Sequence, residues 1–533
     1  MTLLRYSSNM IREDIKGILQ KIVPDEHIII DYVPKGKKGD YTTNVAFKIA
    51  AKKGLQPTRA AEQIAAQIKN PMISSVTVYE PGFINFTISR DHLLHQLLRE
   101  DMKLDFGRGK RMLIEYVSVN PTGPINVVNA RAAAIGDSLV RLLNKTGYEA
   151  IAEYYVNDAG RQTYLLAESV RQRMIELEGG TPKIPEDGYH GEYLIDVAKE
   201  IRDKGLRDIE EIKEYTVNYF ITRQKETLHR FGVVFDNWIR ESEIYKKGYI
   251  TKVLNVLEEQ NYTYSKGDAL WFKATAFGDS DDRVIITSDG RYTYLLTDIA
   301  YHLDKIKRKY DRLINIWGPD HHGRIRGLIG GVVALQYPED IIDIIIVQEV
   351  KLKKGGQLVS MSKRAGTFEK LEELLEQIPK DVVRFFMLMR SNSQHLDFDL
   401  DLALKESEEN PVYYVQYAYA RIRSIMRLSK EKGFKDTSTC DVSLIKEDEE
   451  ITLVKNILKF PEVLEDTTRN LEPYHVAYYL IDLARAFHYF YQKHRVVSED
   501  RNLTEARLEL IKKTAETLKS GLEILGISCP ERM

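Results

Sequence analysis

The segment 112–143 constrains the fold most, because it joins a short strand pattern, a turn and a long helical pattern. Met112–Val117 is mostly apolar, as is typical of a strand buried in a parallel sheet. Asn120–Pro124 is rich in turn-forming residues, and Ala130–Leu143 carries apolar residues at helical spacing. Strand, turn and helix in this order open the doubly wound α/β folds that bind nucleotides. We therefore predict a Rossmann-like parallel sheet, with a second strand at Ala150–Val156.

Two later segments extend this predicted sheet. Leu313–Trp317 and Ile341–Val347 are again short apolar runs of the kind found in parallel strands. The region 165–275 between the early and late strands is largely helical and charged, so we predict that it is an insertion. The sheet and its insertion together define a predicted central domain over residues 106–380.

Different patterns flank the central domain. Residues 1–105 combine an amphipathic helical start with strand-like runs and further helices, which predicts a small N-terminal α/β domain. From Asp381 onward nearly every apolar pattern is helical, which predicts an all-α bundle over 381–533. The predicted fold class is therefore α/β, with a smaller α/β domain before the parallel sheet and a helical bundle after it.

Composition restricts the setting and the chemistry. The 533 residues include 77 basic and 79 acidic side chains, so net charge alone does not predict nucleic-acid binding. No apolar run is long enough for a membrane-spanning helix, and the N-terminus lacks the apolar core of a signal peptide. Cys440 and Cys529 lie too far apart in sequence for a disulfide framework or a metal-ligand spacing. We expect a cytoplasmic protein with no membrane contact and no bound metal.

The segment 115–137, EYVSVNPTGPINVVNARAAAIGD, is the most informative in the chain. It resembles the first signature of class I aminoacyl-tRNA synthetases, in the form found in arginyl-tRNA synthetases. A helix start presents free N–H groups and a positive dipole end to phosphates, and side-chain donors there stabilise charge in the transition state. The resemblance implies that Asn126, Val128 and Asn129 occupy ATP-binding positions, and that Asn126 and Asn129 occupy catalytic ones.

A second segment, Ser360–Gly366, resembles the mobile Lys-Met-Ser-Lys loop of the same class. The resemblance implies that Met361, Ser362 and Lys363 contact ATP, and that the Lys363 ammonium neutralises the departing pyrophosphate. His321 follows a predicted strand at the edge where α/β sheets line their ligand crevice, and it is a further expected ATP contact.

Recognition of arginine is expected from carboxylates, because a guanidinium prefers planar, bidentate partners. Tyr294 and Asp298 lie one helical turn apart and therefore share a helix face. The resemblance assigns the guanidinium or ammonium group of arginine to Glu115 and Asp298, with Ser118, Asn120 and Tyr294 around the substrate.

Recognition of tRNA is expected from both flanking domains. The segments 39–44 and 81–86 resemble the N-terminal domain of arginyl-tRNA synthetases, in which Phe83 and Asn85 could stack on and hydrogen-bond an unstacked base. Equally, Phe83 fits a place in the domain core. The segment 410–422 resembles the opening helix of the anticodon-binding bundle, with the predicted tRNA contacts Tyr413, Tyr414, Gln416 and Tyr417.

The chain departs from the family pattern at four positions. Asn126 and Asn129 replace two histidines, Val128 replaces a glycine, and Ser360 replaces the first lysine. Asparagine donates hydrogen bonds but cannot become cationic, and a valine side chain fills space that glycine leaves open. Three hypotheses follow: a working arginine–tRNA ligase, an impaired relative that binds tRNA or arginine in an accessory role, and a ligase for another substrate.

Over residues 35–533 the resemblance implies one reaction. Arginine and ATP, carried as its Mg²⁺ complex, form arginyl-adenylate and pyrophosphate, and the arginyl group then passes to tRNA(Arg). We expect a monomer that needs tRNA for the first step. Since adjacent histidines have poor ligand spacing, no zinc site is predicted at His321 and His322.

Overall fold

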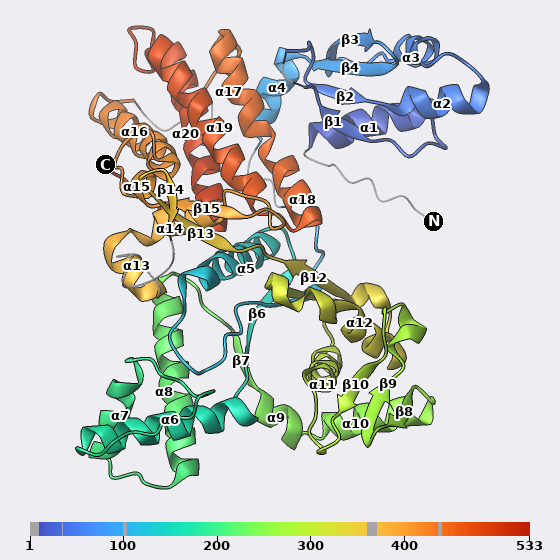
Figure 1. Cartoon of the computed structure of the whole chain (residues 1–533). Coiled ribbons are helices and arrows are strands. Elements are labelled where there is room, and N and C mark those ends of the chain that lie inside the picture. The colour runs from blue at the N-terminus through green and yellow to red at the C-terminus, as the bar shows by residue number, and fades with distance from the viewer. Residues whose placement is uncertain (1–9, 35, 100–103, 360–369, 435–439) are drawn as a thin grey trace.

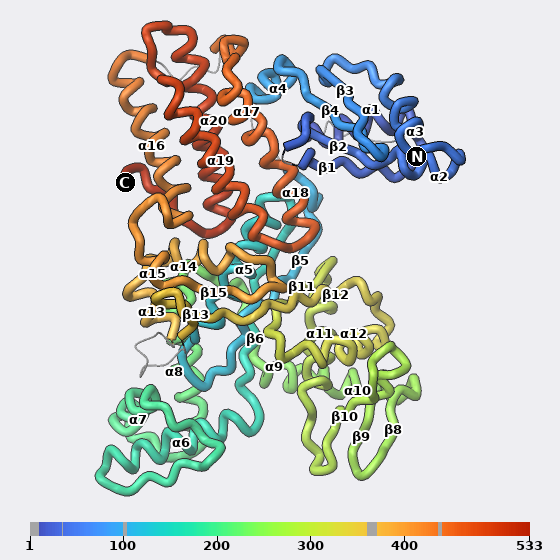
Figure 2. The backbone as a smooth tube through the Cα atoms, turned by 45° about the horizontal axis from the view of Figure 1, so that its top comes forward, coloured from blue at the N-terminus to red at the C-terminus, as the bar shows by residue number. Residues whose placement is uncertain are grey.

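The computed structural model describes residues 10–34, 36–99, 104–359, 370–434 and 440–533. The chain forms a small N-terminal α/β domain, a central domain built on a parallel sheet, and a C-terminal helical bundle (Figure 1). Both views place the N-terminal domain beside the bundle, and the bundle against the central domain (Figures 1 and 2). The predicted fold class is confirmed. No helix in these ranges is both long and apolar enough to cross a membrane.

The central sheet has five strands in the order β12-β11-β5-β6-β7, and every neighbouring pair is parallel. The strands are β5 (Arg111–Glu115), β6 (Glu149–Val156), β7 (Asn237–Arg240), β11 (Arg312–Trp317) and β12 (Ile342–Ile346). The first strand, β5, lies in the middle, so the chain builds outward from it in both directions. In such sheets ligands bind at the carboxyl ends of the strands where this reversal occurs.

Helices cover both faces of the sheet, which explains why β5 is apolar on both sides. Helix α5 (Val127–Lys145) packs on one face with Met112 and Ile114, while Leu113 faces a core made by α10, α11 and α12. A Cβ atom at Gly136 would lie 2.2 Å from Cγ of Tyr116, so only glycine allows α5 to pack this closely. The covering helices on the other face are α10 (Tyr249–Glu259), α11 (Tyr294–Lys307) and α12 (Ile325–Ala334).

The predicted insertion at 165–275 divides into separate pieces. Helices α6 (Arg161–Leu177), α7 (Leu194–Asp203) and α8 (Ile209–Arg230) have a small hydrophobic core of their own. The chain then returns to the main sheet as β7 and continues into α9 (Glu241–Lys246). An antiparallel sheet of β8 (Thr263–Lys266), β9 (Ala269–Phe272) and β10 (Arg283–Ile286) follows. Strand β7 was missed because its four residues are too few to show a period.

The N-terminal domain is a four-stranded antiparallel sheet, ordered β1-β2-β4-β3, with helices packed against it. Its elements are α1 (Ile11–Ile22), β1 (Ile30–Tyr32), β2 (Tyr41–Thr43), α2 (Val45–Lys53), α3 (Pro57–Ala65), β3 (Ile73–Tyr79), β4 (Phe83–Ile88) and α4 (Arg90–Leu97). Polar contacts join this domain to the bundle: Arg12 forms a bidentate pair with Asp466, and the Tyr32 hydroxyl donates to Glu462 at 2.6 Å.

The C-terminal bundle comprises α16 (Pro411–Glu431), α17 (Asp448–Leu458), α18 (Phe460–Asn470), α19 (Tyr474–Lys493) and α20 (Arg501–Ile524). A connecting layer joins it to the sheet domain through β13 (Val350–Lys354), β14 (Gln357–Val359), α13 (Leu371–Gln377), α14 (Lys380–Met387), β15 (Leu396–Asp399) and α15 (Leu400–Ala403). Arg384 in this layer is fully buried. It donates to Asp137 of α5 at 2.5 Å and to the Leu525 carbonyl at 3.0 Å, which locks bundle and sheet domain together.

Candidate active site

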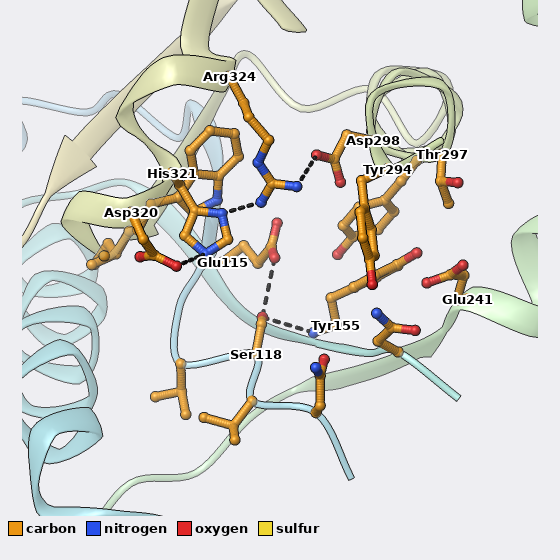
Figure 3. Close-up of a pocket in the computed structure, with 18 of the residues that line it drawn as sticks. Glu115, Ser118, Tyr155, Glu241, Tyr294, Thr297, Asp298, Asp320, His321 and Arg324 are labelled. Atoms are coloured by element: carbon orange, nitrogen blue, oxygen red, sulfur yellow. Dashed lines mark hydrogen bonds and ion pairs between the residues drawn. The ribbon is translucent and has the colours of Figure 1, made fainter. Parts of the chain in front are cut away.

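A cavity of about 540 Å³ opens at the carboxyl ends of the central strands (Figure 3). Glu115 at the end of β5, Tyr155 near the end of β6 and Trp317 at the end of β11 line it. Tyr294 and Asp298, from the first turns of α11, close the opposite side. The cavity therefore lies where the order of the parallel strands reverses, at the place expected for a ligand.

The backbone after β5 turns sharply and brings Ser118 back toward Glu115. Val117 and Ser118 both have positive φ angles, 68° and 45°, which are costly for residues with side chains and for valine especially. The Ser118 hydroxyl donates to Oε1 of Glu115 at 3.0 Å and accepts the backbone N–H of Tyr155 at 3.1 Å. Through Ser118, this strained turn connects the ends of β5 and β6 and orients the Glu115 carboxylate.

The second oxygen of Glu115 is held by a buried lysine that the sequence analysis did not identify. Nζ of Lys305, from α11, lies 2.5 Å from Oε2 of Glu115 and 2.9 Å from Oδ1 of Asn315. The Lys305 side chain is 1% exposed. Lys305 therefore positions the Glu115 carboxylate and compensates its charge inside the domain.

Asp298 presents a carboxylate in a very different environment. Burial raises the pKa of Asp298 to about 7; Arg324 opposes this shift and the Glu115 carboxylate adds to it. Nη1 of Arg324 lies 3.7 Å from Oδ2 of Asp298. As pH rises, Asp298 therefore loses its proton only near neutral pH, and a cationic ligand meets the uncharged acid below that pH.

Glu241, the first residue of α9, is a third carboxylate in the cavity, and the sequence analysis missed it as well. It is buried, its Oε1 accepts the Tyr245 hydroxyl at 2.7 Å, and burial raises its pKa. The signal that would have revealed it was β7, because Glu241 directly follows that strand at the ligand edge of the sheet.

Aromatic rings complete the wall of the cavity. The Tyr155 ring stacks on Tyr301 with centroids 4.4 Å apart, and the Tyr301 hydroxyl donates to the buried Glu153 at 2.6 Å. Asn120, another predicted arginine contact, lines the same cavity and donates to the Gln162 side chain at 2.7 Å. All five predicted arginine-binding side chains thus line one cavity: Glu115, Ser118, Asn120, Tyr294 and Asp298.

Comparison with known proteins decides the family. The arginyl tRNA synthetase N-terminal domain model matches residues 9–88, the catalytic domain model for class I (R) tRNA synthetases matches 93–396, and the DALR anticodon binding domain model matches 415–533. The arginine–tRNA ligase of Bacillus subtilis is 40% identical over the full length of both chains. The chain belongs to the arginyl-tRNA synthetase family.

Further relatives agree with this assignment. The arginine–tRNA ligase of Desulforamulus reducens is 40% identical, with 97% of this chain and 96% of the relative covered. The arginyl-tRNA synthetase structure from Thermus thermophilus has a TM-score of 0.80 at 23% identity, over 98% of this chain and 100% of that one, and so supports the fold. The family explains why three domains with unrelated patterns occur in this order.

The segment that resembles the first class I signature lies at the start of α5, beside the cavity. Asn126 precedes the helix, and its backbone N–H donates to Oδ1 of Asn129 at 3.2 Å, so Asn129 caps the helix while lining the cavity. Val128 is 42% exposed, so its side chain lies on the open surface of the first turn.

The segment after the predicted Lys-Met-Ser-Lys loop returns to this helix start, because Lys370 forms a backbone bridge with Asn126. Met361, Ser362 and Lys363 themselves, with Ser360, lie outside the described residues.

His321 lines the same cavity as Glu115 and Asp298. Its Nδ1 accepts a hydrogen bond from Arg324, its Nε2 lies 3.4 Å from Asp320, and burial together with the Arg324 charge lowers its pKa. The imidazole is therefore held neutral, and any contact with ATP would use it as a hydrogen-bonding group rather than a cation.

The predicted tRNA contacts differ in exposure. Phe83 is half-buried and packs edge-on against Phe47, whereas Asn85 is buried with its amide donating to the Lys38 carbonyl at 2.9 Å. The two residues are two apart on β4 and so lie on one face of the sheet, as expected, but the Asn85 amide already has a partner. A direct base contact by Asn85 requires that this hydrogen bond be exchanged.

The predicted anticodon contacts lie on the first two turns of α16. Tyr413, Tyr414 and Tyr417 are half-buried, and the rings of Tyr414 and Tyr417 both pack against His488. Gln416 is buried, and its amide donates to Asp381 and to the Ser528 carbonyl, each at 3.0 Å. Its hydrogen bonds join α16 to α14 and to the C-terminus, which is a structural role.

Proposed function

We propose that this protein is an arginine–tRNA ligase, which activates L-arginine with ATP and transfers the arginyl group to tRNA(Arg). The observation that carries the proposal is that the carboxylates of Glu115, Glu241 and Asp298 line the same cavity as Asn129 at the start of α5. Carboxylates suit a substrate that bears both a guanidinium and an ammonium group, and a helix start suits the phosphates of ATP.

The geometry favours different acidic residues for the guanidinium and for the ammonium group of arginine. Asp298 and Glu241, beside the Tyr294 ring, suit the guanidinium, because they stand on the side of the cavity away from α5. Glu115, fixed by Lys305 and oriented by Ser118, suits the ammonium group. The substrate carboxylate then points toward the start of α5, where attack on the α-phosphate takes place.

We infer that Asn126 and Asn129 serve the ATP step as neutral hydrogen-bond donors at the helix start. ATP arrives with Mg²⁺ as part of the substrate, and its triphosphate gains from the free N–H groups of α5. Neutral donors stabilise developing negative charge less than cationic histidines, so we expect slower activation than a histidine-bearing signature would give. Lys363 is the proposed partner of the leaving pyrophosphate.

The test is arginine- and ATP-dependent charging of tRNA, with tRNA present from the start. The natural protein is expected to charge, and the variant Asn126→His/Val128→Gly/Asn129→His is expected to charge faster. Asp298→Asn should lose about a hundredfold or more in kcat/KM for arginine, because it removes a charged partner of the guanidinium. Absence of charging by the natural protein, with well-folded protein and intact tRNA, refutes the proposal.

A further inference from the structure

A positively charged side chain already occupies the cavity proposed for arginine. The Arg324 guanidinium lies between Asp298 on one side and His321 on the other (Figure 3). Its Cζ is 5.8 Å from the ring centroid of Tyr294 and 5.9 Å from that of Trp317. A carboxylate, a neutral imidazole and two aromatic faces thus surround one guanidinium, and each of these groups attracts such a cation.

The partners of Arg324 overlap with those proposed for the substrate. Asp298 and Tyr294 are the residues expected to receive the guanidinium of L-arginine, and both contact Arg324. Two guanidinium groups at one carboxylate repel each other, so Arg324 and the substrate compete for the same place. Glu115 does not relieve this conflict at Asp298, because Lys305 already compensates its charge.

We propose that Arg324 is an internal competitor of the substrate: its guanidinium fills the guanidinium subsite at Asp298 in the free protein, and L-arginine must displace it. This inference rests on the proposed function. Arg324 is thereby a specificity-determining residue, because only a ligand that pairs with Asp298 better than this tethered side chain can enter. Only molecules in which Arg324 has moved away can bind L-arginine. The apparent affinity for arginine therefore equals the affinity of the open cavity multiplied by the fraction of such molecules.

Moving the Arg324 side chain away from Asp298 costs little free energy in this structure. Arg324 is the last residue of the short helical turn Pro319–Arg324, directly before α12, and its side chain is 34% exposed. Its contact with Asp298 is a single approach of 3.7 Å rather than a bidentate pair. A partly exposed ion pair of this kind contributes little free energy, so the side chain can turn toward solvent when a better partner arrives.

The experiment is calorimetric titration of L-arginine into the full-length natural protein, Arg324→Met, Arg324→Lys and Arg326→Met. Arg326 is the matched control: it lies two residues further on, is 61% exposed and pairs with Glu339 outside the cavity. Arg324→Met is expected to bind arginine about two- to tenfold more tightly, because the competitor is gone. Arg324→Lys, which keeps a cation, should stay near the natural protein, and Arg326→Met should equal it.

Two further readouts separate competition from a structural role. In charging assays Arg324→Met should lower KM for arginine while kcat at saturating arginine stays the same. In an Asp298→Asn background the tightening should disappear, since the shared partner is absent. Equal or weaker arginine binding by Arg324→Met, or tightening that persists without Asp298, overturns the inference, as does a lack of arginine binding by every protein in the set.

The two proposals fail in different ways. If the natural protein does not charge tRNA but Arg324→Met still binds arginine more tightly, the competitor inference stands and the proposed function falls. If the natural protein charges tRNA and Arg324→Met binds arginine no more tightly, the proposed function stands and the inference falls.

Discussion

Replacing Lys305 with methionine should destabilise the protein strongly. The Lys305 ammonium is buried, and it contacts both Glu115 and Asn315 across the packing of α11 on the sheet. Methionine fills a similar volume but leaves the Glu115 carboxylate without its cation inside the domain. Breaking one side of a buried ion pair typically costs about 3–5 kcal/mol, far more than the pair itself contributes over an apolar replacement.

Urea denaturation of the natural protein, Lys305→Met and Lys307→Met measures this cost. Lys307 lies on the same helix but is exposed, so its variant should stay within about 0.5 kcal/mol of the natural protein. Thermal melting should show a fall of roughly 6 °C or more for Lys305→Met, at about 2–4 °C per kcal/mol for a domain of this class. Combining Lys305→Met with Glu115→Gln should recover part of the loss. A Lys305→Met protein within 1 kcal/mol of the natural one, on the order of a surface substitution, would show that the pair is not buried as described.

Three other predictions follow from the same contacts. Because the pKa of Asp298 is about 7 and only its ionised form attracts a cation, arginine binding should weaken as pH falls from 8 to 6, and Asp298→Asn should flatten that dependence in calorimetry. Gly136→Ala places a Cβ against the Tyr116 ring and should cost about 1–3 kcal/mol in denaturant melts; no loss contradicts the close packing. Arg384→Met leaves Asp137 without one of its two arginine partners and should lower the free energy of unfolding by about 3 kcal/mol. An unchanged melting temperature would show that the buried Arg384–Asp137 pair does not hold the bundle to the sheet domain.

The sequence determined the parts of the site that depend on local order along the chain. The strand–turn–helix pattern predicted β5 and α5, and the spacing of Tyr294 and Asp298 predicted their shared helix face, because side chains four apart on a helix are neighbours. The signature residues marked the ligand edge of the sheet. These features depend on backbone periodicity and turn chemistry, which the amino-acid order expresses directly.

The side chains that complete the site come together through the packing of distant elements. Lys305 lies 190 residues from Glu115 in sequence, and Glu241 enters the cavity through a strand too short to show a pattern. Arg324 reaches Asp298 only because η2 (Pro319–Arg324) and α11 meet above the sheet. Likewise, burial rather than residue type committed Gln416 to a structural hydrogen bond. Partners and burial of this kind depend on how separate elements pack, and no periodicity within one element encodes that packing.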